Sequence, residues 1–444
     1  MYSAYISTNN VIYLDQTEIQ MLIEFSVTNF RSIFERQTLS LAMASGGEHR
    51  DTNVFQFDGA NKFDLLRSAA IYGPNASGKS NLLIALRTMQ DCVRESATKL
   101  TSGDKLPAEV FKLDPEARKL PSEFEVTIIA KGVRYQYGFS ISQERVEEEW
   151  LLAYPKGRPQ QWFTREWDKV GCKYRWEIGS ALIGEKQLWQ KSTRDNSLFL
   201  STAVQLNCEQ LKPIFDWFDD ILHTVKVGGW GSGYSASLCE TKGKKELLLN
   251  FLRAADLDIE DIGVKSEEFS EKKLPQDMPQ QLKSHLSAEL KGHKIFEITT
   301  FHKDSEGQPV PFDFLDESDG TQKLFNFAGP WLDSLEHGSV LFVDELHDNL
   351  HPKLVSFLIE LFHNDLTNPK NAQLVFTTHE TSILSQDVFR RDQIWFCEKS
   401  DKKSTSLFSL TDFSPRKGRE NLEAAYLSGR YGALPYVRKI RGGS

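Results

Sequence analysis

Apolar and polar residues alternate along MLIEFSVTNF (21–30), the pattern of a strand with one buried face. A second strand is expected at SAAIYG (68–73), which runs through a glycine-rich loop into the helical pattern SNLLIALRTMQDCV. Residues 122–142 predict a hairpin, because β-branched and aromatic residues flank a KGV turn. The stretch EEEWLLAYPKG extends this antiparallel sheet by one strand.

The last third of the chain alternates apolar strands with amphipathic helices. Strands are predicted at FEITTFHK, SVLFVDEL, AQLVFTTHE and DQIWFCEK, and helices at Gly320 and at HPKLVSFLIELFHN. This alternation indicates a parallel sheet that is buried on both faces. Between residues 185 and 295 the pattern is mostly helical and polar, without a sustained heptad repeat.

Composition places the chain among soluble globular proteins, with 40% apolar and 26% charged residues. A net charge of −9 argues against non-specific coating of DNA by a monomer but leaves room for a local basic face. Five scattered cysteines without a CxxC pair fit a reduced cytoplasmic protein. Neither a membrane-spanning apolar run nor a signal-peptide pattern occurs, so a cytoplasmic location without a membrane partner is expected.

The stretch GPNASGKS (73–80) matches G-x4-G-K-[ST] and lies between an expected strand and an expected helix. In such a loop the backbone N–H groups converge on phosphates, Lys79 adds a positive charge, and Ser80 offers a hydroxyl to Mg²⁺. ATP and Mg²⁺ are therefore the expected cofactors. The expected nucleotide-binding residues here are Gly73, Pro74, Asn75, Ala76, Ser77, Gly78, Lys79, Ser80 and Asn81.

Two acids, Asp344 and Glu345, follow the apolar strand VLFV. Downstream of a P-loop this is the Walker B arrangement, in which Asp344 holds Mg²⁺ and Glu345 polarises the attacking water. The alternative is a pair of acids that caps the next helix. His379 ends the following strand; a lone histidine there is commonly structural, but this position allows contact with a terminal phosphate.

The stretch DESDGTQKLFNF (316–327) places Ser318, Gly320 and Thr321 at the start of a helix. A hydroxyl, a glycine and unpaired backbone N–H groups in this position form an anion site. A simple N-cap at Ser318 or Asp319 is the alternative interpretation.

The order of P-loop, Ser-x-Gly-Thr at a helix start, strand-Asp-Glu and His resembles the ATP-binding-cassette (ABC) ATPases, particularly their SMC-like branch. The resemblance implies that Ser318, Gly320 and Thr321 contact ATP held by a second subunit. FSVTNFRSI resembles the first strand of SMC-like and recombination-type ATPases, which implies that Arg31 lies near the nucleotide. With YGFSI, VDELHDNLHPKL and FTTHETSIL, these motifs also resemble bacterial ATPases of abortive-infection and anti-phage systems, such as the ATPase component of PARIS.

Two departures from the family pattern stand out. Asp348-Asn349-Leu350-His351 follows Walker B where many cassette ATPases have Ser-Ala-Leu-Asp, so communication between paired sites is expected to differ. No certain Q-loop glutamine is present. Gln143, at the end of the hairpin, is a candidate for contact with Mg²⁺, and a plain surface glutamine is the alternative.

The fold class implied is α/β: an ABC-type ATPase head with a mixed sheet, a P-loop helix, an antiparallel β subdomain and a mostly helical insertion. A chain of 444 residues exceeds what one hydrophobic core normally organises. The expected parts are an N-terminal extension (1–20), the first part of the head (21–160), the insertion (161–295), the second part of the head (296–400) and a C-terminal segment for docking or assembly (401–444).

The expected function is an ATPase that dimerises around ATP and acts as a sensor or scaffold in anti-phage defence. Its effector, a nuclease or toxin, would be a separate polypeptide, since no nuclease motif follows His379. A higher homo-oligomer and contact with nucleic acid through the basic, aromatic C-terminal segment are compatible with the sequence. The alternatives are a DNA-repair clamp, a transporter motor subunit and a protein that binds ATP without hydrolysing it.

Overall fold

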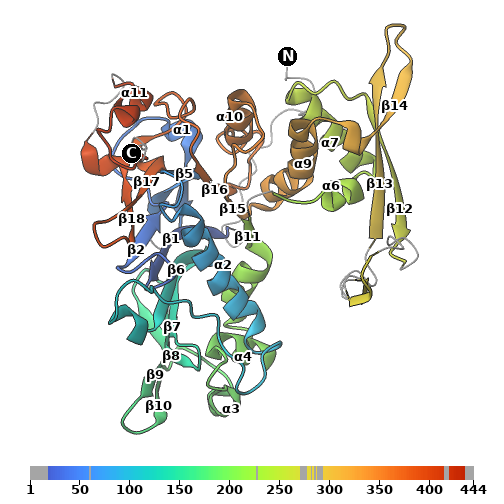
Figure 1. The fold of residues 1–444 in the computed structure, drawn as a ribbon. Helices are drawn as coiled ribbons and strands as arrows, with labels where there is room; N and C mark the ends of the chain where they lie inside the picture. The colour runs from blue at the N-terminus through green and yellow to red at the C-terminus, as the bar shows by residue number, and fades with distance from the viewer. Residues whose placement is uncertain are drawn as a thin grey trace, which may run out of the picture. The chain divides into compact units, whose positions relative to one another are not determined.

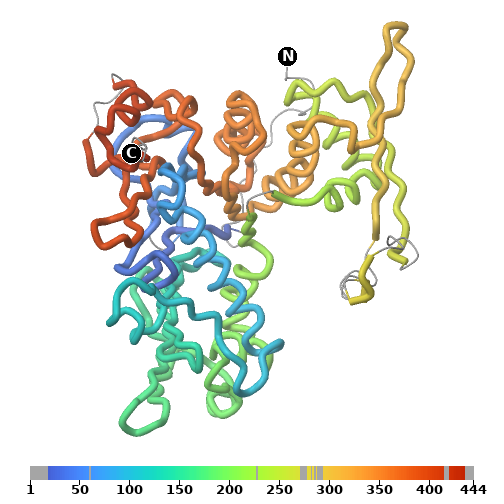
Figure 2. The backbone as a smooth tube through the Cα atoms, viewed as in Figure 1, coloured from blue at the N-terminus to red at the C-terminus, as the bar shows by residue number. Residues whose placement is uncertain are grey.

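A computed structural model describes residues 19–59, 62–226, 229–270, 278–281, 283–284, 287, 294–414 and 420–435. These residues form two compact units (Figure 1). Unit 1 comprises the described residues of 1–227, 334–347 and 358–444, and unit 2 those of 228–333 and 348–357. Figure 2 follows the chain from unit 1 into unit 2 after β11 and back through α9. The expected N-terminal extension lies almost entirely outside the described residues.

A six-stranded sheet, named here the P-loop sheet, forms the centre of unit 1 in the order β11-β15-β16-β5-β17-β18. The strands from β11 to β17 run parallel, and β18 is antiparallel to β17. The strands are β5 (Ser68–Tyr72), β11 (Leu222–Val225), β15 (Val340–Val343), β16 (Gln373–Thr378), β17 (Ile394–Lys399) and β18 (Thr405–Ser409).

The three central strands β15, β16 and β5 are buried at every position, as the run of apolar residues predicted. Helix α2 (Lys79–Glu95) follows β5 through the P-loop and contributes Leu82, Leu86 and Met89 to the main core of unit 1. The parallel sheet and its P-loop helix confirm the expected α/β class. Since β18 lies within 401–444, the described part of the C-terminal segment adds a strand to the head, and its docking or assembly role stays a prediction.

A seven-stranded antiparallel sheet forms the other half of unit 1, in the order β10-β9-β8-β7-β6-β1-β2. The predicted hairpin is confirmed as β6 and β7, which pair along their whole length. The strands are β1 (Met21–Thr28), β2 (Gln37–Ser40), β6 (Ser122–Ala130), β7 (Val133–Ile141), β8 (Val146–Tyr154), β9 (Gln160–Asp168) and β10 (Lys173–Ile178).

The insertion differs from the mostly helical lobe that was expected over 161–295. Strands β9 and β10 occupy its beginning, and the neighbouring residues Trp162 and Phe163 are both buried where β9 pairs with β8. Unit 2 combines helices with a three-stranded sheet, β12-β13-β14. The polar stretch at 271–293, predicted to be helical, lies largely outside the described residues. Unit 2 contains α6 (Gly233–Leu238), α7 (Lys242–Ala254), β12 (Asp261–Glu268), β13 (Lys294–Lys303), β14 (Pro309–Asp313), η5 (Phe314–Asp316) and most of α9 (Asp319–His337).

Shorter elements connect and cover these sheets. They are α1 (Arg50–Asn53), β3 (Val54–Asp58), β4 (Lys62–Leu66), η2 (Ala117–Lys119), α3 (Lys186–Ser192), α4 (Phe199–Gln205), α5 (Lys212–Asp216), the π-helical turn η3 (Trp217–Ile221), α10 (Pro352–Glu360), η6 (Arg391–Gln393), η7 (Leu410–Phe413) and α11 (Leu422–Leu427). No helix in the described part of the chain is long and apolar enough to cross a membrane.

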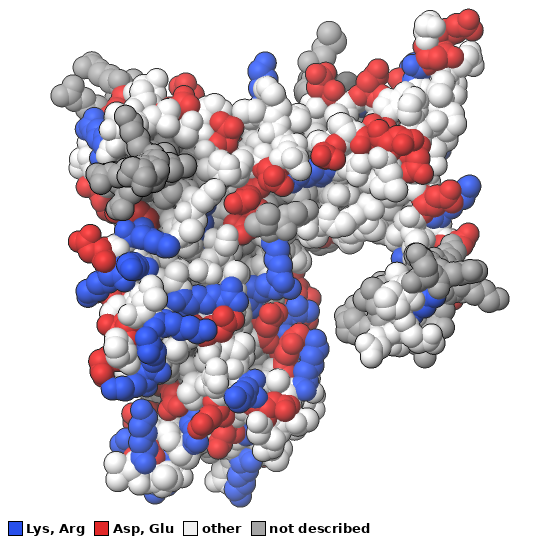
Figure 3. All heavy atoms as spheres, viewed as in Figure 1, with Lys and Arg blue, Asp and Glu red and all other residues white. Residues whose placement is uncertain are grey.

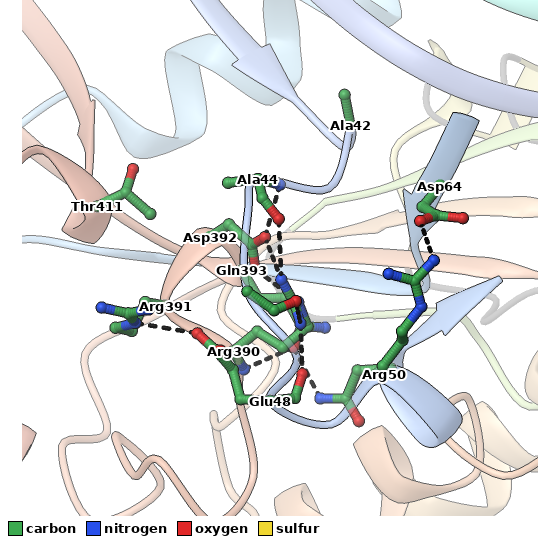
Figure 4. Close-up of polar contacts among 12 residues, drawn as sticks. Ala42, Ala44, Glu48, Arg50, Asp64, Arg390, Arg391, Asp392, Gln393 and Thr411 are labelled. Atoms are coloured by element: carbon green, nitrogen blue, oxygen red, sulfur yellow. Dashed lines mark hydrogen bonds and ion pairs between the residues drawn. The ribbon is translucent and has the colours of Figure 1, made fainter. Parts of the chain in front are cut away.

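A buried arginine joins the N-terminal part of unit 1 to the strand β17 (Figure 4). The Arg390 guanidinium donates to both carboxylate oxygens of Asp392, at 2.9 and 2.8 Å, and to the backbone carbonyls of Ala44 and Glu48. Asp392 also accepts the N–H of Ala44 at 2.8 Å. Arg390 is 1% exposed, so this pairing satisfies a charge that would otherwise be costly to bury.

A buried histidine makes the stability of unit 1 depend on pH. The Nε2 atom of His363 lies 2.7 Å from Ser68 Oγ, and burial lowers the pKa of His363 to about 3. Below the ordinary histidine pKa of 6.5 the unfolded chain binds a proton that the folded chain does not. We therefore expect the free energy of unfolding to fall by about 1.4 kcal/mol per pH unit from this group as the pH drops from 6.5 toward 3.

Urea unfolding at several pH values between about 7 and 5 measures this slope. The His363→Gln variant is the control, since it has no titrating ring at this position. Its stability should change less steeply with pH than that of the natural chain, and equal slopes would contradict the assignment.

Candidate functional site

The predicted motifs meet at one edge of the P-loop sheet. The P-loop follows β5, Asp344 and Glu345 follow β15, and His379 follows β16. These three strands are adjacent and parallel, so their carboxyl ends lie at the same edge. Ligands of open α/β sheets bind at that edge.

Lys79 is folded back onto its own loop. Its Nζ donates to the carbonyl oxygens of Gly73 at 2.7 Å and Pro74 at 3.1 Å, and the residue is 6% exposed. Burial lowers the pKa of Lys79, while the charges of Cys397, Glu345 and Asp344 act in the opposite direction. A bound polyphosphate would supply the negative charge that this buried ammonium lacks.

Two residues that the sequence analysis did not single out, Ser32 and Thr405 of β18, brace the P-loop. Asn81 Nδ2 donates to Ser32 Oγ at 2.7 Å, and Ser32 Oγ lies 2.7 Å from Thr405 Oγ1, which donates to the Ser77 carbonyl at 2.9 Å. Gly78, with φ of 113°, has no room for a side chain, because a Cβ there would lie 1.9 Å from Thr405 Oγ1. These contacts hold the phosphate-binding turn in place.

A cavity of about 880 Å³ opens over the P-loop. It brings together most of the predicted nucleotide residues with Glu345 and His379. Its walls are formed by Arg31, Ser32, Asn75, Ala76, Ser77, Gly78, Lys79, Ser80, Asn81, Glu109, Val110, Phe111, Lys112, Leu113, Glu345, His379, Lys399 and Lys403. Gly73 and Pro74 line a neighbouring cavity together with Tyr426 and Leu427 of α11.

Positive charge surrounds the cavity. Besides Lys79, it is lined by Arg31, Lys112, Lys399 and Lys403. Arg31 has a left-handed backbone (φ 50°), and its guanidinium forms an ion pair with Glu109 at 2.8 Å. In Figure 3, Lys and Arg gather in a band on the visible face of unit 1. Such a field favours an anionic ligand.

The acids after β15 lie where a metal-bound phosphate would need them. Asp344 is 7% exposed and lines a cavity of about 560 Å³ with Ser80 and Arg31. A serine hydroxyl and one carboxylate beside phosphate oxygens and water suit Mg²⁺. The residues present therefore fit the predicted ion, which Ser80 and Asp344 would hold.

His379 has a partner that sequence reasoning missed. Its Nε2 atom lies 2.9 Å from Nε2 of His347, and the two rings meet edge to face at 3.9 Å between centroids. One ring must therefore donate and the other accept in this contact. His347 stands two residues after Glu345, so the contact joins the loop after β15 to the loop after β16.

Ser318, Gly320 and Thr321, named here the signature residues, lie in unit 2 at the start of α9. The Ser318 hydroxyl accepts the N–H of Thr321 at 3.2 Å and lies 2.9 Å from Thr321 Oγ1, so Ser318 caps the helix as the simpler interpretation predicted. Gly320 passes close to the backbone, since a Cβ there would lie 3.2 Å from the Asn349 carbonyl. Ser318 itself is exposed, which leaves the helix start accessible.

Gln143 is not brought to the phosphate cavity. It lies between β7 and β8, where its carbonyl accepts the N–H of Leu106 at 2.9 Å, and it is absent from the described residues that line the cavity. Lys226, directly after β11, lies with Ser80 and Asp344 in the smaller cavity instead. Gln143 is likewise absent from the described residues that line the smaller cavity, so its contact with Mg²⁺ stays a prediction without support from either cavity.

Comparison with solved structures finds similar chains at low identity. An SMC head domain from Thermotoga maritima is 11% identical, with a TM-score of 0.37, and the match covers 87% of this chain and 98% of that one. The recombination mediator RecF with ATP is 14% identical, with a TM-score of 0.36, over 88% of this chain and 99% of that one. An SMC head bound to the C-terminal winged-helix domain of ScpA is 12% identical, with a TM-score of 0.32, over 87% and 97%. Similarity at this level says nothing about what this chain binds.

No curated protein matches the sequence. The sequence pattern of one protein family does match, over residues 68–194 and 240–385, which together make up more than half of the chain. The matched stretches contain the P-loop, the signature, Asp344, Glu345 and His379. The chain therefore belongs to the family described as "AAA domain, putative AbiEii toxin, Type IV TA system".

Proposed function

We propose that this protein binds and hydrolyses ATP with Mg²⁺ and that ATP joins two copies of its head. The observation that carries the proposal is the single cavity in which Lys79, Ser80, Glu345 and His379 meet. These are the groups that phosphoryl transfer to water requires: a phosphate cradle, a metal ligand, a base and a contact to the terminal phosphate.

Each side chain has a defined task in this reaction. The Lys79 ammonium leaves its loop carbonyls and binds the outer phosphates, with the N–H groups at the start of α2 beside it. Mg²⁺, held by Ser80 and Asp344, would neutralise charge on the phosphates. Glu345 orients and deprotonates the attacking water, and His379 donates to the terminal phosphate oxygen.

The exposed start of α9 is the element proposed to close a second copy's site. Ser318, Gly320 and the helix N-terminus offer a hydroxyl and N–H groups to the γ-phosphate. Asp316 and Asp319 flank this point and are exposed. They disfavour free ATP at α9, whereas the cations around the P-loop cavity, Lys399 and Lys403 among them, would offset them in a dimer.

The proposed biological role is that of a sensor or scaffold in anti-phage defence, resembling the ATPase component of PARIS. The family's description, which names a putative AbiEii toxin and a Type IV TA system, supports this role. ATP binding would join the heads and hydrolysis would release them, so one phosphate would switch the hold on a separate effector nuclease or toxin. A clamp on duplex DNA is the second candidate, and the basic band of unit 1 favours it.

Purification of tagged Glu345→Gln protein from its native host with ATP present tests this role. We expect a nuclease or toxin to co-elute in a fixed stoichiometry and to be lost from the Lys79→Ala protein. DNA that co-elutes without a protein partner would favour the clamp. An unaccompanied protein in both preparations would contradict control of an effector.

A further inference from the structure

Two short loops close the phosphate end of the cavity. Residues 344–347 follow β15, and residues 377–379 end β16 and begin the next loop. The two strands pair in parallel with Val343 opposite Phe376, so the next positions bring Asp344 beside Thr377. Thr377 is fully buried between the groups assigned to the metal, the water and the phosphate.

The Thr377 hydroxyl contacts both acidic residues at once. Its Oγ1 accepts the backbone N–H of Glu345 at 2.8 Å and lies 2.6 Å from Oδ1 of Asp344. Because the amide can only donate, the Thr377 hydroxyl donates its own hydrogen to the Asp344 carboxylate. The Thr377 carbonyl also accepts the N–H of Leu346 at 3.1 Å. Away from water, such bonds order their partners strongly.

Glu345 needs this support, because its backbone is in the left-handed region with φ of 52°. A glutamate in that region is strained and stays there only where neighbouring contacts hold it. The two bonds from Glu345 and Leu346 to Thr377 are contacts of this kind. Without them the turn can relax and carry the Glu345 carboxylate away from the attacking water.

We propose that Thr377 is a positioning residue for both acids: it holds the Asp344 carboxylate toward the metal and fixes the turn that carries Glu345. The inference rests on the proposed ATPase function. The hydrogen bond to Oδ1 fixes the rotation of the Asp344 carboxylate. Thr377 does not contact the substrate; it acts through Asp344 and Glu345.

Substitution of the hydroxyl by a methyl group tests the proposal. In Thr377→Val we expect kcat to fall by about 10- to 100-fold, the cost of one or two lost buried hydrogen bonds, with the KM for ATP nearly unchanged. Mg²⁺ should increase the affinity for ATP, and the Mg²⁺ concentration that gives half of this increase should be higher in the variant. The affinity for ATP without Mg²⁺ should stay the same. Thr377→Ser, which keeps the hydroxyl, should recover most of kcat.

The neighbouring residue supplies a matched control. Thr378 is also fully buried on β16, but its hydroxyl accepts the N–H of Glu380 at 3.0 Å instead of an N–H after β15. Thr378→Val should therefore leave the Mg²⁺ dependence unchanged, since its hydroxyl contacts neither Asp344 nor Glu345. If Thr377→Val does not fold, Thr377→Ala and Thr377→Ser can be compared instead, since these two variants differ only in the hydroxyl group.

The outcomes separate this inference from the function on which it rests. A natural chain that hydrolyses no ATP overturns the proposed function. A natural chain that hydrolyses ATP, with Thr377→Val matching its kcat and Mg²⁺ dependence, overturns only the role of Thr377. Equal changes of the Mg²⁺ dependence in Thr377→Val and Thr378→Val would show a general packing effect and overturn it as well.

Discussion

Replacement of Lys79 by alanine should weaken ATP binding by about 100-fold or more. The ammonium makes charge-assisted hydrogen bonds to phosphates, and the loss of about 3 kcal/mol corresponds to two powers of ten in affinity. The loop already holds the ammonium in place, because Lys79 Nζ donates to the carbonyls of Gly73 and Pro74 beside the start of α2. Equilibrium binding of a fluorescent ATP analogue measures the effect.

Lys403→Ala is the matched control for Lys79→Ala. Lys403 lines the same cavity but is exposed, so its removal should lower the affinity only slightly. The unfolding temperature of both variants must be measured, because Lys79→Ala leaves the carbonyls of Gly73 and Pro74 without the hydrogen bonds from Lys79. An affinity equal to that of the natural chain in a folded Lys79→Ala protein would exclude the P-loop as the nucleotide site.

Replacement of Glu345 by glutamine should stop turnover while ATP still binds. The amide keeps the size of the side chain but cannot take the proton of the attacking water, so we expect kcat to fall by about 100- to 10,000-fold. If two heads close over ATP, the uncleaved nucleotide should keep them together, so the dimer should accumulate. Steady-state phosphate release and light scattering after size-exclusion chromatography measure the two effects.

Comparison of ATP with ADP is the control within this variant. The dimer should form with ATP and Mg²⁺ and be absent with ADP, because only ATP carries the γ-phosphate that the second copy would bind. A Glu345→Gln protein that releases phosphate at the natural rate would show that another group activates the water.

The parts of the site that could be predicted from sequence are local. The P-loop, the two acids and His379 each end an apolar strand, and the order of those strands places them at one sheet edge. Ser318 as a helix cap is equally local, since its bond to Thr321 spans three residues. Short-range patterns of this kind can be recognised in the sequence without knowledge of the tertiary fold.

The supports of the site depend on contacts between distant segments. Ser32 and Thr405 meet across 373 positions, and Thr377 reaches Asp344 across 33. Neither contact has a sequence signal, because a threonine in an apolar strand has the same pattern whether its hydroxyl bonds its neighbour or an acid. The register of β15 against β16 decides which occurs.

The errors in the fold have similar causes. The strand β11 (LHTV) is only four residues long, and β12 has a single buried position, so neither shows a clear alternation of apolar and polar residues. Pairing with neighbouring strands determined these elements.

Hydrolysis by a mixture of two inactive variants tests most directly the claim that α9 of one copy completes the site of another. Lys79→Ala removes a P-loop, and Ser318→Arg blocks a signature. If the signature acts in trans, each mixed dimer has one intact site, and an equal mixture at high protein concentration should recover up to about a quarter of the natural activity. A mixture no more active than its two components would contradict the shared site.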